Sequence, residues 1–318
     1  MPDSPVFIKI EEAAQALKAG ELVAIPTETV YGLAADAMNP QAVKKIFALK
    51  GRPADHPLIV HIASSENLSV WAKDIPDVAY RLADAFWPGP LTFILPKRDE
   101  IPDIVTGGQH TVGLRSPNNP LTLALLKHFD GGLAAPSANR FGRISPTAAQ
   151  HVQDEFGVDA PKILDGGPCQ IGIESTIVDL SQSPARILRP GQISFEQLLP
   201  FLPELVYGAQ KTSPRVSGDM EAHYAPRTPL YMLDRSQLIS QAGNKSSVVL
   251  CFDYLPDNLS GLVMQKNADI YAQQLYANLR TLDNFQAEQI LIEQIPVSND
   301  WLAINDRIKR AIIGSSPN

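Results

Sequence analysis

Amphipathic stretches alternate with short apolar runs along the first half of the chain. Apolar side chains at helical spacing predict helices at 11–19, 40–49, 76–86, 121–129 and 147–156. Gly20 and Gly51 follow two of these helices as expected for helix ends, and Pro146 is expected to begin the last one. Apolar runs between turn residues predict strands at 22–25, 58–62, 91–95, 111–115 and 132–135. This alternation indicates an α/β domain.

The rest of the first half has a different pattern. Three strand-like runs follow one another, at 162–164, 175–180 and 186–188. Strands that follow each other directly indicate antiparallel neighbours, so the sheet is expected to be mixed. We therefore predict an open, twisted mixed sheet with flanking helices.

A segment without a clear period follows, at 203–228. It is too long for an ordinary connection and is expected to be a linker or lid. Beyond it, strands are predicted at 229–233, 248–252 and 289–293, and amphipathic helices at 268–282 and 301–313. The sequence therefore predicts a large α/β domain at 1–202, a linker at 203–228 and a smaller α/β domain at 229–318.

Composition and charge narrow the class of protein. Of the 318 residues, 44% are hydrophobic and 19% charged, which is ordinary for a globular protein. The net charge of -7 argues against nucleic-acid binding through overall electrostatics. Cys169 and Cys251 are far apart and lack metal-type spacing, which favours a reducing compartment. No signal-peptide pattern and no apolar run near the ~20 residues of a membrane span are found, so we expect a soluble, cytoplasmic protein.

The run KGRPADHPLIVHI at 50–62 places two cations before an apolar strand. Its prolines fix φ and remove backbone donors, which predicts a stiff loop. The planar guanidinium of Arg52, which can donate two parallel hydrogen bonds, and the ammonium group of Lys50 suit a polyphosphate. The alternative is a surface turn with solvated charges. No GxxxxGK[ST] or GxGxxG sequence occurs, which excludes a P-loop and argues against a dinucleotide fold.

Polar residues also follow other predicted strands. Thr27 and Thr29 come directly after a strand that ends at Pro26, where they either contact a small polar ligand or cap the next helix. Arg115 ends a strand, where it either clamps a carboxylate or forms a surface ion pair.

A loop rich in small residues follows the strand at 132–135. Ser137, Asn139 and Ser145 offer hydrogen bonds there, and small residues allow a ligand to approach the backbone. Ser145 precedes Pro146, so a helix cap is its alternative role. In the glycine-rich region that follows, Ser175 begins a strand and Arg189 ends one. Cys169 is interpreted as a small buried side chain.

These motifs occur together and in one order. They are PTETVYGL, KGRPADHPLIVHI, WPGPLTFIL, TVGLRSP, APSANRFGRISPT, GIESTIVDL and ILRPG, followed by HYAP at 223–226 and AINDR at 303–307. The set resembles the YrdC-like family of L-threonylcarbamoyl-AMP synthases in its two-domain form, over nearly the whole chain. One departure is the linker run at 213–218, where the family has a shorter SPGM-type segment.

The resemblance implies a fold and a reaction. Similar proteins have an open α/β sheet with a deep basic cavity, followed by a Rossmann-like domain. They are nucleotidyltransferases that make threonylcarbamoyl-AMP and pyrophosphate from L-threonine, bicarbonate or CO2, and ATP. The product serves the threonylcarbamoyladenosine modification of tRNA through downstream transfer proteins. Catalysis would depend on positioning and on neutralising phosphate charge, and no stable nucleic-acid complex is expected.

The resemblance also assigns residues to two ligands. Those expected to bind ATP are Lys50, Arg52, His56, Thr111, Ser137, Asn139, Ser145, Arg189 and Tyr224, with Lys50 and Arg52 as the catalytic pair. Those expected around L-threonine are Thr29, His61, Arg115, Ala135 and Ser175. Mg²⁺ is expected with ATP, held mainly by phosphates and water, because no carboxylate cluster marks a metal site in the protein.

Two other functions share this type of domain. The first is an RNA-binding or ribosome-associated module without turnover, which the acidic net charge opposes. The second is a carbamoyl-adenylate-forming enzyme of hydrogenase maturation. That function needs zinc-finger and acylphosphatase-like segments, and the chain has no cysteine pairs for the former.

Overall fold

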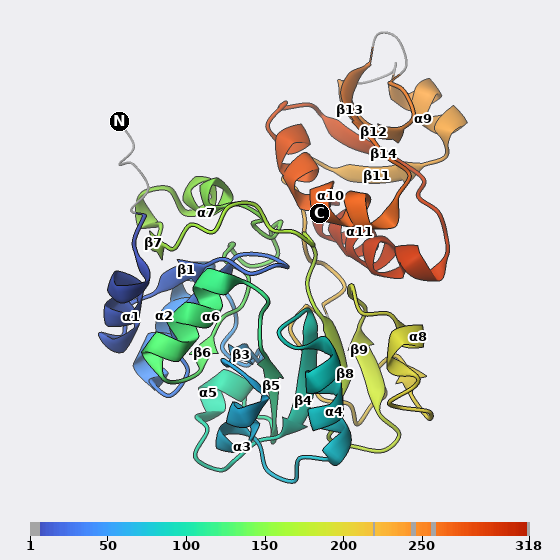
Figure 1. Ribbon diagram of the computed structural model, residues 1–318. Helices are drawn as coiled ribbons and strands as arrows, with labels where there is room; N and C mark the ends of the chain where they lie inside the picture. Colours follow the sequence, from blue (N-terminus) through green and yellow to red (C-terminus); the bar gives the residue numbers. More distant parts are fainter. Residues whose placement is uncertain (1–6, 219, 243–245, 256–258, 317–318) are drawn as a thin grey trace. The chain divides into compact units, whose positions relative to one another are not determined.

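The computed structural model describes residues 7–218, 220–242, 246–255 and 259–316. The chain forms two compact units (Figure 1). The first unit holds most of the chain before residue 219, including the described linker residues 203–218. The second holds the chain from Met220 onward together with the short segments Gly142–Ser145 and Ile171–Ile173.

The first unit is built on a ten-stranded sheet with the strand order β10-β9-β8-β4-β5-β3-β6-β2-β1-β7. Its strands are β1 (Val23–Ile25), β2 (Gly32–Asp36), β3 (Ile59–His61), β4 (Leu91–Pro96), β5 (Thr111–Arg115), β6 (Leu133–Ala134), β7 (Lys162–Ile163), β8 (Thr176–Asp179), β9 (Arg186–Arg189) and β10 (Val206–Tyr207). Parallel pairs such as β3–β5 and β4–β8 occur beside antiparallel pairs such as β4–β5 and β8–β9. The predicted mixed sheet is confirmed.

Helices flank this sheet (Figure 1). They are α1 (Ile10–Lys18), α2 (Pro40–Lys50), α3 (Leu68–Trp71), α4 (Asp77–Phe86), α5 (Asp103–Thr106), α6 (Pro120–Phe129), α7 (Ala149–Phe156) and α8 (Phe195–Leu198), with the 3₁₀ turns η1 (Ser65–Asn67) and η2 (Gly157–Asp159). Most of the expected helices are present within one or two residues. The last begins later than predicted, because Ala148 is its N-cap and Pro146 lies outside it.

Both faces of the hairpin β1–β2 are buried, so its strands lack a polar face. Ala24 and Leu33 belong to one apolar cluster, which includes Ile46 of α2. Val23 and Ala34 belong to another, which includes residues of α1 and α6. Helices on both faces of a sheet explain why β2, a run of small residues, carries no alternating pattern that would have predicted it as a strand.

Helix α2 fixes the position of Lys50. The Asn39 side chain accepts hydrogen bonds from the first backbone N–H groups, and Pro40 occupies the first turn. The helix ends where Gly51 adopts a left-handed conformation with φ 64°. Lys50 is therefore the last helical residue, and the stiff loop that was predicted to begin at Lys50 begins after it.

The second unit has a four-stranded parallel sheet with the order β11-β14-β12-β13. Its strands are β11 (Leu230–Leu233), β12 (Ser247–Phe252), β13 (Ser260–Met264) and β14 (Gln289–Glu293), and its helices are α9 (Arg235–Ala242), α10 (Ala268–Asp283) and α11 (Leu302–Ser315), preceded by the 3₁₀ turn η3 (Asn299–Trp301). Strand β13 and helix α9 were not predicted. No helix in the described ranges is long and apolar enough to cross a bilayer.

Candidate active site

Two predicted threonine-site residues end neighbouring strands of the first unit. Strands β3 and β5 run parallel, and their register pairs His61 with Arg115. Both side chains are buried, each with 4% of its surface exposed. The carboxyl ends of the parallel strands β3 and β5 therefore bring His61 and Arg115 together. Ala135 follows β6, which runs antiparallel to β3, so it lies at the start of β3, where its N–H donates to the carbonyl of Ile59 at 3.0 Å.

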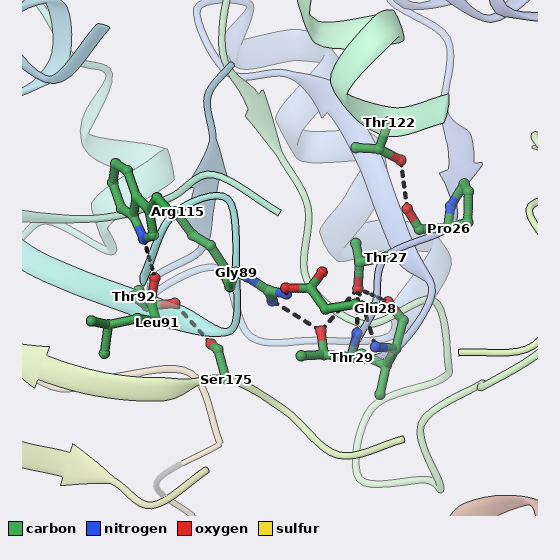
Figure 2. A network of polar contacts seen from close by, with 12 residues as sticks. Pro26, Thr27, Glu28, Thr29, Gly89, Leu91, Thr92, Arg115, Thr122 and Ser175 are labelled. Carbon is green, nitrogen blue, oxygen red and sulfur yellow. Dashed lines mark hydrogen bonds and ion pairs between the residues drawn. The ribbon is translucent and has the colours of Figure 1, made fainter. Parts of the chain in front are cut away.

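Arg115 is held on three sides (Figure 2). Its Nε donates to the carbonyl of Gly89 at 3.1 Å, and its Nη1 donates to Thr29 Oγ1 at 2.9 Å. Its Nη2 lies 2.7 Å from Glu28 Oε1 in an ion pair. Because both partners are buried, the alternative of a surface ion pair is wrong. Glu28 was not predicted, since nothing local distinguishes a buried carboxylate between two threonines from a solvated one.

The loop that carries Thr29 is fixed by its own side chains. Thr27 Oγ1 accepts from the N–H groups of Thr29 and Val30 and donates to the Val30 carbonyl at 2.6 Å. It also lies 2.8 Å from Thr29 Oγ1 (Figure 2). Asn39 caps the next helix, so the alternative that Thr27 or Thr29 is its N-cap is wrong. The loop instead presents the Thr29 hydroxyl to Arg115.

Burial keeps His61 neutral. Loss of solvent contact, and secondly the charge of Arg115, lowers the pKa of His61 to about 3. Its Nδ1 has no hydrogen-bond partner among the described residues. At neutral pH the imidazole is thus an uncharged hydrogen-bonding group beside a guanidinium.

This lowered pKa predicts how stability depends on pH. The unfolded chain binds a proton at His61 below pH 6.5, whereas the folded chain does not until about pH 3. The stability contributed by the neutral ring is therefore complete above pH 6.5 and is lost as the pH falls. Between pH 6.5 and 4.5 the wild type should lose roughly 2–3 kcal/mol more unfolding free energy than His61→Gln, which has no group that titrates at this position. Urea unfolding at the two pH values measures this, with the exposed His128→Gln as control. Equal losses in wild type and His61→Gln would contradict the assignment.

Ser175 connects the two predicted ligand groups. Its hydroxyl lies 2.8 Å from Thr92 Oγ1, a buried neighbour on β4 that sequence analysis also missed (Figure 2). Arg189 Nη2 donates to Ser175 Oγ at 3.1 Å and to the Ser175 carbonyl at 3.0 Å. A predicted ATP residue is therefore bonded directly to a predicted threonine residue.

Lys50 is buried against the small-residue loop, with 3% of its surface exposed. Its Nζ donates to the carbonyls of Ser137 and Asn139, each at 2.5 Å. Burial, and secondly the charge of Arg52, holds the pKa of Lys50 well below its usual range. Lys50 and Arg52 are both buried, so the alternative of a surface turn with solvated charges is wrong. Their role in binding an anion stays a prediction.

Arg52 and His56 lie against one aromatic ring. The Arg52 guanidinium carbon is 6.0 Å from the centre of the Phe141 ring, and the His56 ring meets the same ring edge-on at 5.5 Å. Arg52 Nη2 donates to the Pro57 carbonyl at 3.0 Å and to Ser217 Oγ at 3.3 Å. The guanidinium is thus oriented by the loop, the ring and the linker.

Part of the linker fills the space beside these cations. Arg189 Nη1 donates to the Ser217 carbonyl at 2.7 Å, so Ser217 contacts both Arg52 and Arg189. Val216 is buried in a cluster with Ile94 and Ile177. Val216 and Ser217 also line a small cavity that includes Thr111. In this arrangement, linker residues occupy donors that were predicted to bind phosphate.

Two predicted ATP residues, Ser145 and Tyr224, belong to the second unit. Tyr224 has φ 62°, and its ring stacks on Tyr276 and lies 5.2 Å from the guanidinium carbon of Arg307. Ser145 is buried, and the nearby helix is capped by Ala148, so the alternative that Ser145 is a helix cap is wrong. The roles of Ser145 and Tyr224 toward ATP stay predictions.

Cys169 is buried in the first unit. Burial, and secondly the charge of Glu28, raises the pKa of the Cys169 thiol to about 12. A thiol that stays protonated at neutral pH is a poor nucleophile. The interpretation of Cys169 as a small buried side chain is confirmed.

Buried cations and hydroxyls lie in the loops and at the strand ends of a mixed α/β sheet, an arrangement that fits an enzyme which positions charged substrates. Two family models match the chain: Sua5/YciO/YrdC, described as telomere recombination, over residues 15–191, and the C-terminal domain of threonylcarbamoyl-AMP synthase over residues 193–312. The chain belongs to the threonylcarbamoyl-AMP synthase family, in the form that carries this C-terminal domain.

Curated relatives match over nearly their whole length. The threonylcarbamoyl-AMP synthase of Pyrococcus abyssi is 39% identical, covering 95% of this chain and 94% of the relative. That of Bacillus subtilis is 38% identical, covering 96% and 93%. The crystal structure of P. abyssi Sua5 complexed with L-threonine superimposes with a TM-score of 0.89 at 37% identity, covering 96% of this chain and 94% of that one. These relatives favour the synthase over the RNA-binding alternative.

Proposed function

We propose that the first unit binds L-threonine and ATP in adjoining subsites and joins them, with bicarbonate or CO2, into threonylcarbamoyl-AMP. The observation that carries this proposal is the direct bonding between Ser175 and Arg189, which links the two subsites. The threonine subsite would contain Thr29, His61, Arg115, Ala135 and Ser175. The ATP subsite would contain Lys50, Arg52, His56, Thr111, Ser137, Asn139 and Arg189. The P. abyssi Sua5 structure, which is a complex with L-threonine, supports threonine as a substrate.

The reaction needs no covalent enzyme intermediate. The threonine amine loses its proton and takes up CO2, or bicarbonate with loss of water, to give a carbamate. A carbamate oxygen then bonds to the α-phosphorus of ATP while the bond to pyrophosphate breaks. Arg115 would hold the threonine carboxylate, and Lys50 and Arg52 would neutralise the charge that develops on the phosphates.

Part of the linker has to move before ATP can bind in this site. Ser217 contacts Arg52 and Arg189, so phosphates can take these donors only if Ser217 moves away from them. Ser217 gives each arginine a hydrogen-bond partner until then. This arrangement limits the cost of burying two cations without an anion.

Mg²⁺ would accompany ATP. The described residues contain no cluster of three histidine, cysteine or carboxylate side chains that could hold a metal ion. The cationic donor set fits a nucleotide that brings its own metal, with phosphates and water as the ligands. Mg²⁺ would then neutralise phosphate charge alongside Lys50 and Arg52.

Partners and location follow from the same proposal. The adenylate would be consumed by proteins that transfer the threonylcarbamoyl group to tRNA, without a stable complex between this acidic chain and nucleic acid. We place the protein in the cytoplasm, where its two buried cysteines would stay reduced.

Pyrophosphate release tests the proposal. The purified protein with ATP, Mg²⁺, bicarbonate and L-threonine should release pyrophosphate continuously, and omission of threonine or bicarbonate should stop the release. The control replaces L-threonine with D-threonine, whose inverted centre misplaces the amine relative to Arg115. Release that does not depend on threonine would contradict the proposed function.

A further inference from the structure

Glu28 is a buried carboxylate whose bonding capacity is largely unused. It is 3% exposed, and Figure 2 shows it facing the Arg115 guanidinium. Its Oε1 forms the ion pair with Arg115, whereas its Oε2 accepts no hydrogen bond from any residue in the described ranges. A carboxylate has room for about four hydrogen bonds, and leaving a buried acceptor unpaired is costly. This side chain therefore has an acceptor available for a ligand.

Arg115 has a donor available in the same place. Its Nη2 is in ion-pair contact with Glu28 but donates no aligned hydrogen bond to a described residue. An open cationic donor thus lies next to an open anionic acceptor. A carboxylate ligand would use the first and an ammonium ligand the second.

The charges of Glu28, Arg115 and His61 agree with this geometry. Arg115 and Glu28 cancel, and His61 is neutral because its pKa is lowered to about 3. A ligand with a net charge that bound against these three side chains would carry an uncompensated buried charge, which is expensive. An α-amino acid with both of its groups ionised is neutral overall, and its two charges match the two open groups.

We propose that Glu28 is a specificity-determining residue that accepts the α-ammonium group of the amino-acid substrate and, with Arg115, makes the pocket selective for zwitterions. This inference rests on the proposed function, because it assumes that the amino acid binds at Arg115. It adds a residue that recognises the amino end of the substrate before the amine loses its proton.

Two analogues of threonine separate the two charges. Deaminated threonine, 3-hydroxybutyrate, keeps the carboxylate, and threoninol keeps the ammonium. Equilibrium dialysis against labelled L-threonine, without ATP or bicarbonate, gives the affinity of each by competition and does not depend on turnover. The variant is Glu28→Gln, which keeps the side-chain shape, and the control is Glu66→Gln on an exposed turn.

Wild type and Glu66→Gln should bind L-threonine at least tenfold more tightly than either analogue. Glu28→Gln should bind L-threonine and threoninol about tenfold to a hundredfold more weakly, which corresponds to one charged hydrogen bond. It should lose little or no affinity for 3-hydroxybutyrate, because Arg115 then lacks its internal counter-charge. The preference for L-threonine over 3-hydroxybutyrate should therefore fall at least tenfold.

Equal loss of affinity for L-threonine and 3-hydroxybutyrate would overturn the inference, since a merely structural role of Glu28 affects both alike. Failure of wild type to bind L-threonine would instead count against the proposed function. If Glu28→Gln does not fold, Glu28→Asp provides the test because it keeps the charge. It should retain the preference for L-threonine within about threefold of the wild-type ratio, and loss of that preference would overturn the inference.

Discussion

Replacing Arg52 with Ala is expected to lower kcat/KM for ATP about a thousandfold, or about 4 kcal/mol of transition-state stabilisation. The Arg52 guanidinium is oriented by Pro57 and Phe141. It would donate hydrogen bonds to the phosphates as negative charge develops on them. The fold should survive, because Arg52 is a like charge beside buried Lys50 and its removal relieves repulsion. Steady-state kinetics and circular dichroism measure the two outcomes.

A matched pair of variants separates charge from geometry. Arg52→Lys keeps the charge but loses the paired N–H donors of the guanidinium, so it should be more active than Arg52→Ala and less active than wild type. Arg98→Ala, which removes an exposed partner of Glu100, should change neither kinetics nor stability. Activity of Arg52→Ala within about threefold of wild type would exclude Arg52 from the ATP site.

Replacing Arg115 with Leu should abolish threonine binding and also destabilise the first unit. The substitution removes the proposed clamp for the substrate carboxylate and leaves Glu28 buried without its partner. Breaking a buried pair from one side typically costs roughly 3–5 kcal/mol. Urea unfolding should show a loss of this size, and KM for L-threonine should rise more than a hundredfold.

The double variant Glu28→Gln/Arg115→Leu distinguishes the two effects. It removes both charges, so it should regain most of the lost stability but none of the threonine binding. The exposed Arg81→Leu is the control for loss of an arginine from this unit. A double variant as unstable as Arg115→Leu alone would show that the Glu28–Arg115 pair is not what the single variant disrupts.

Elements with strong local signals were predictable from the sequence. Asn39 and Gly51 mark the ends of α2, and the apolar run at 111–115 is a strand with the predicted bounds. Strand β2 escaped prediction because its small residues have no period, and it is fixed only by pairing with β1 and β6. Strand β13 escaped because it begins with Ser260 and Gly261, of which glycine is a poor strand former, and only Met264 is buried. In both strands, tertiary pairing outweighs local preference.

The site was predictable where a side chain stands at a strand end. Arg115 and Ser175 were singled out that way, because topology brings such ends together, whereas His61 was assigned only by the family resemblance. Glu28 and Ser217 were not, since their importance comes from partners 87 and 165 residues away in the chain: Arg115 for Glu28 and Arg52 for Ser217. Burial of an ion pair and docking of a linker depend on the folded arrangement, which no local pattern encodes.

Isotope transfer from bicarbonate tests directly whether the protein makes threonylcarbamoyl-AMP. The protein is incubated with ATP, Mg²⁺, L-threonine and ¹³C-bicarbonate, and the nucleotide products are analysed by mass spectrometry. The account predicts an adenylate with the mass of threonylcarbamoyl-AMP, heavier by one ¹³C, formed in step with pyrophosphate and absent without threonine. Pyrophosphate release with no label in any adenylate would contradict it.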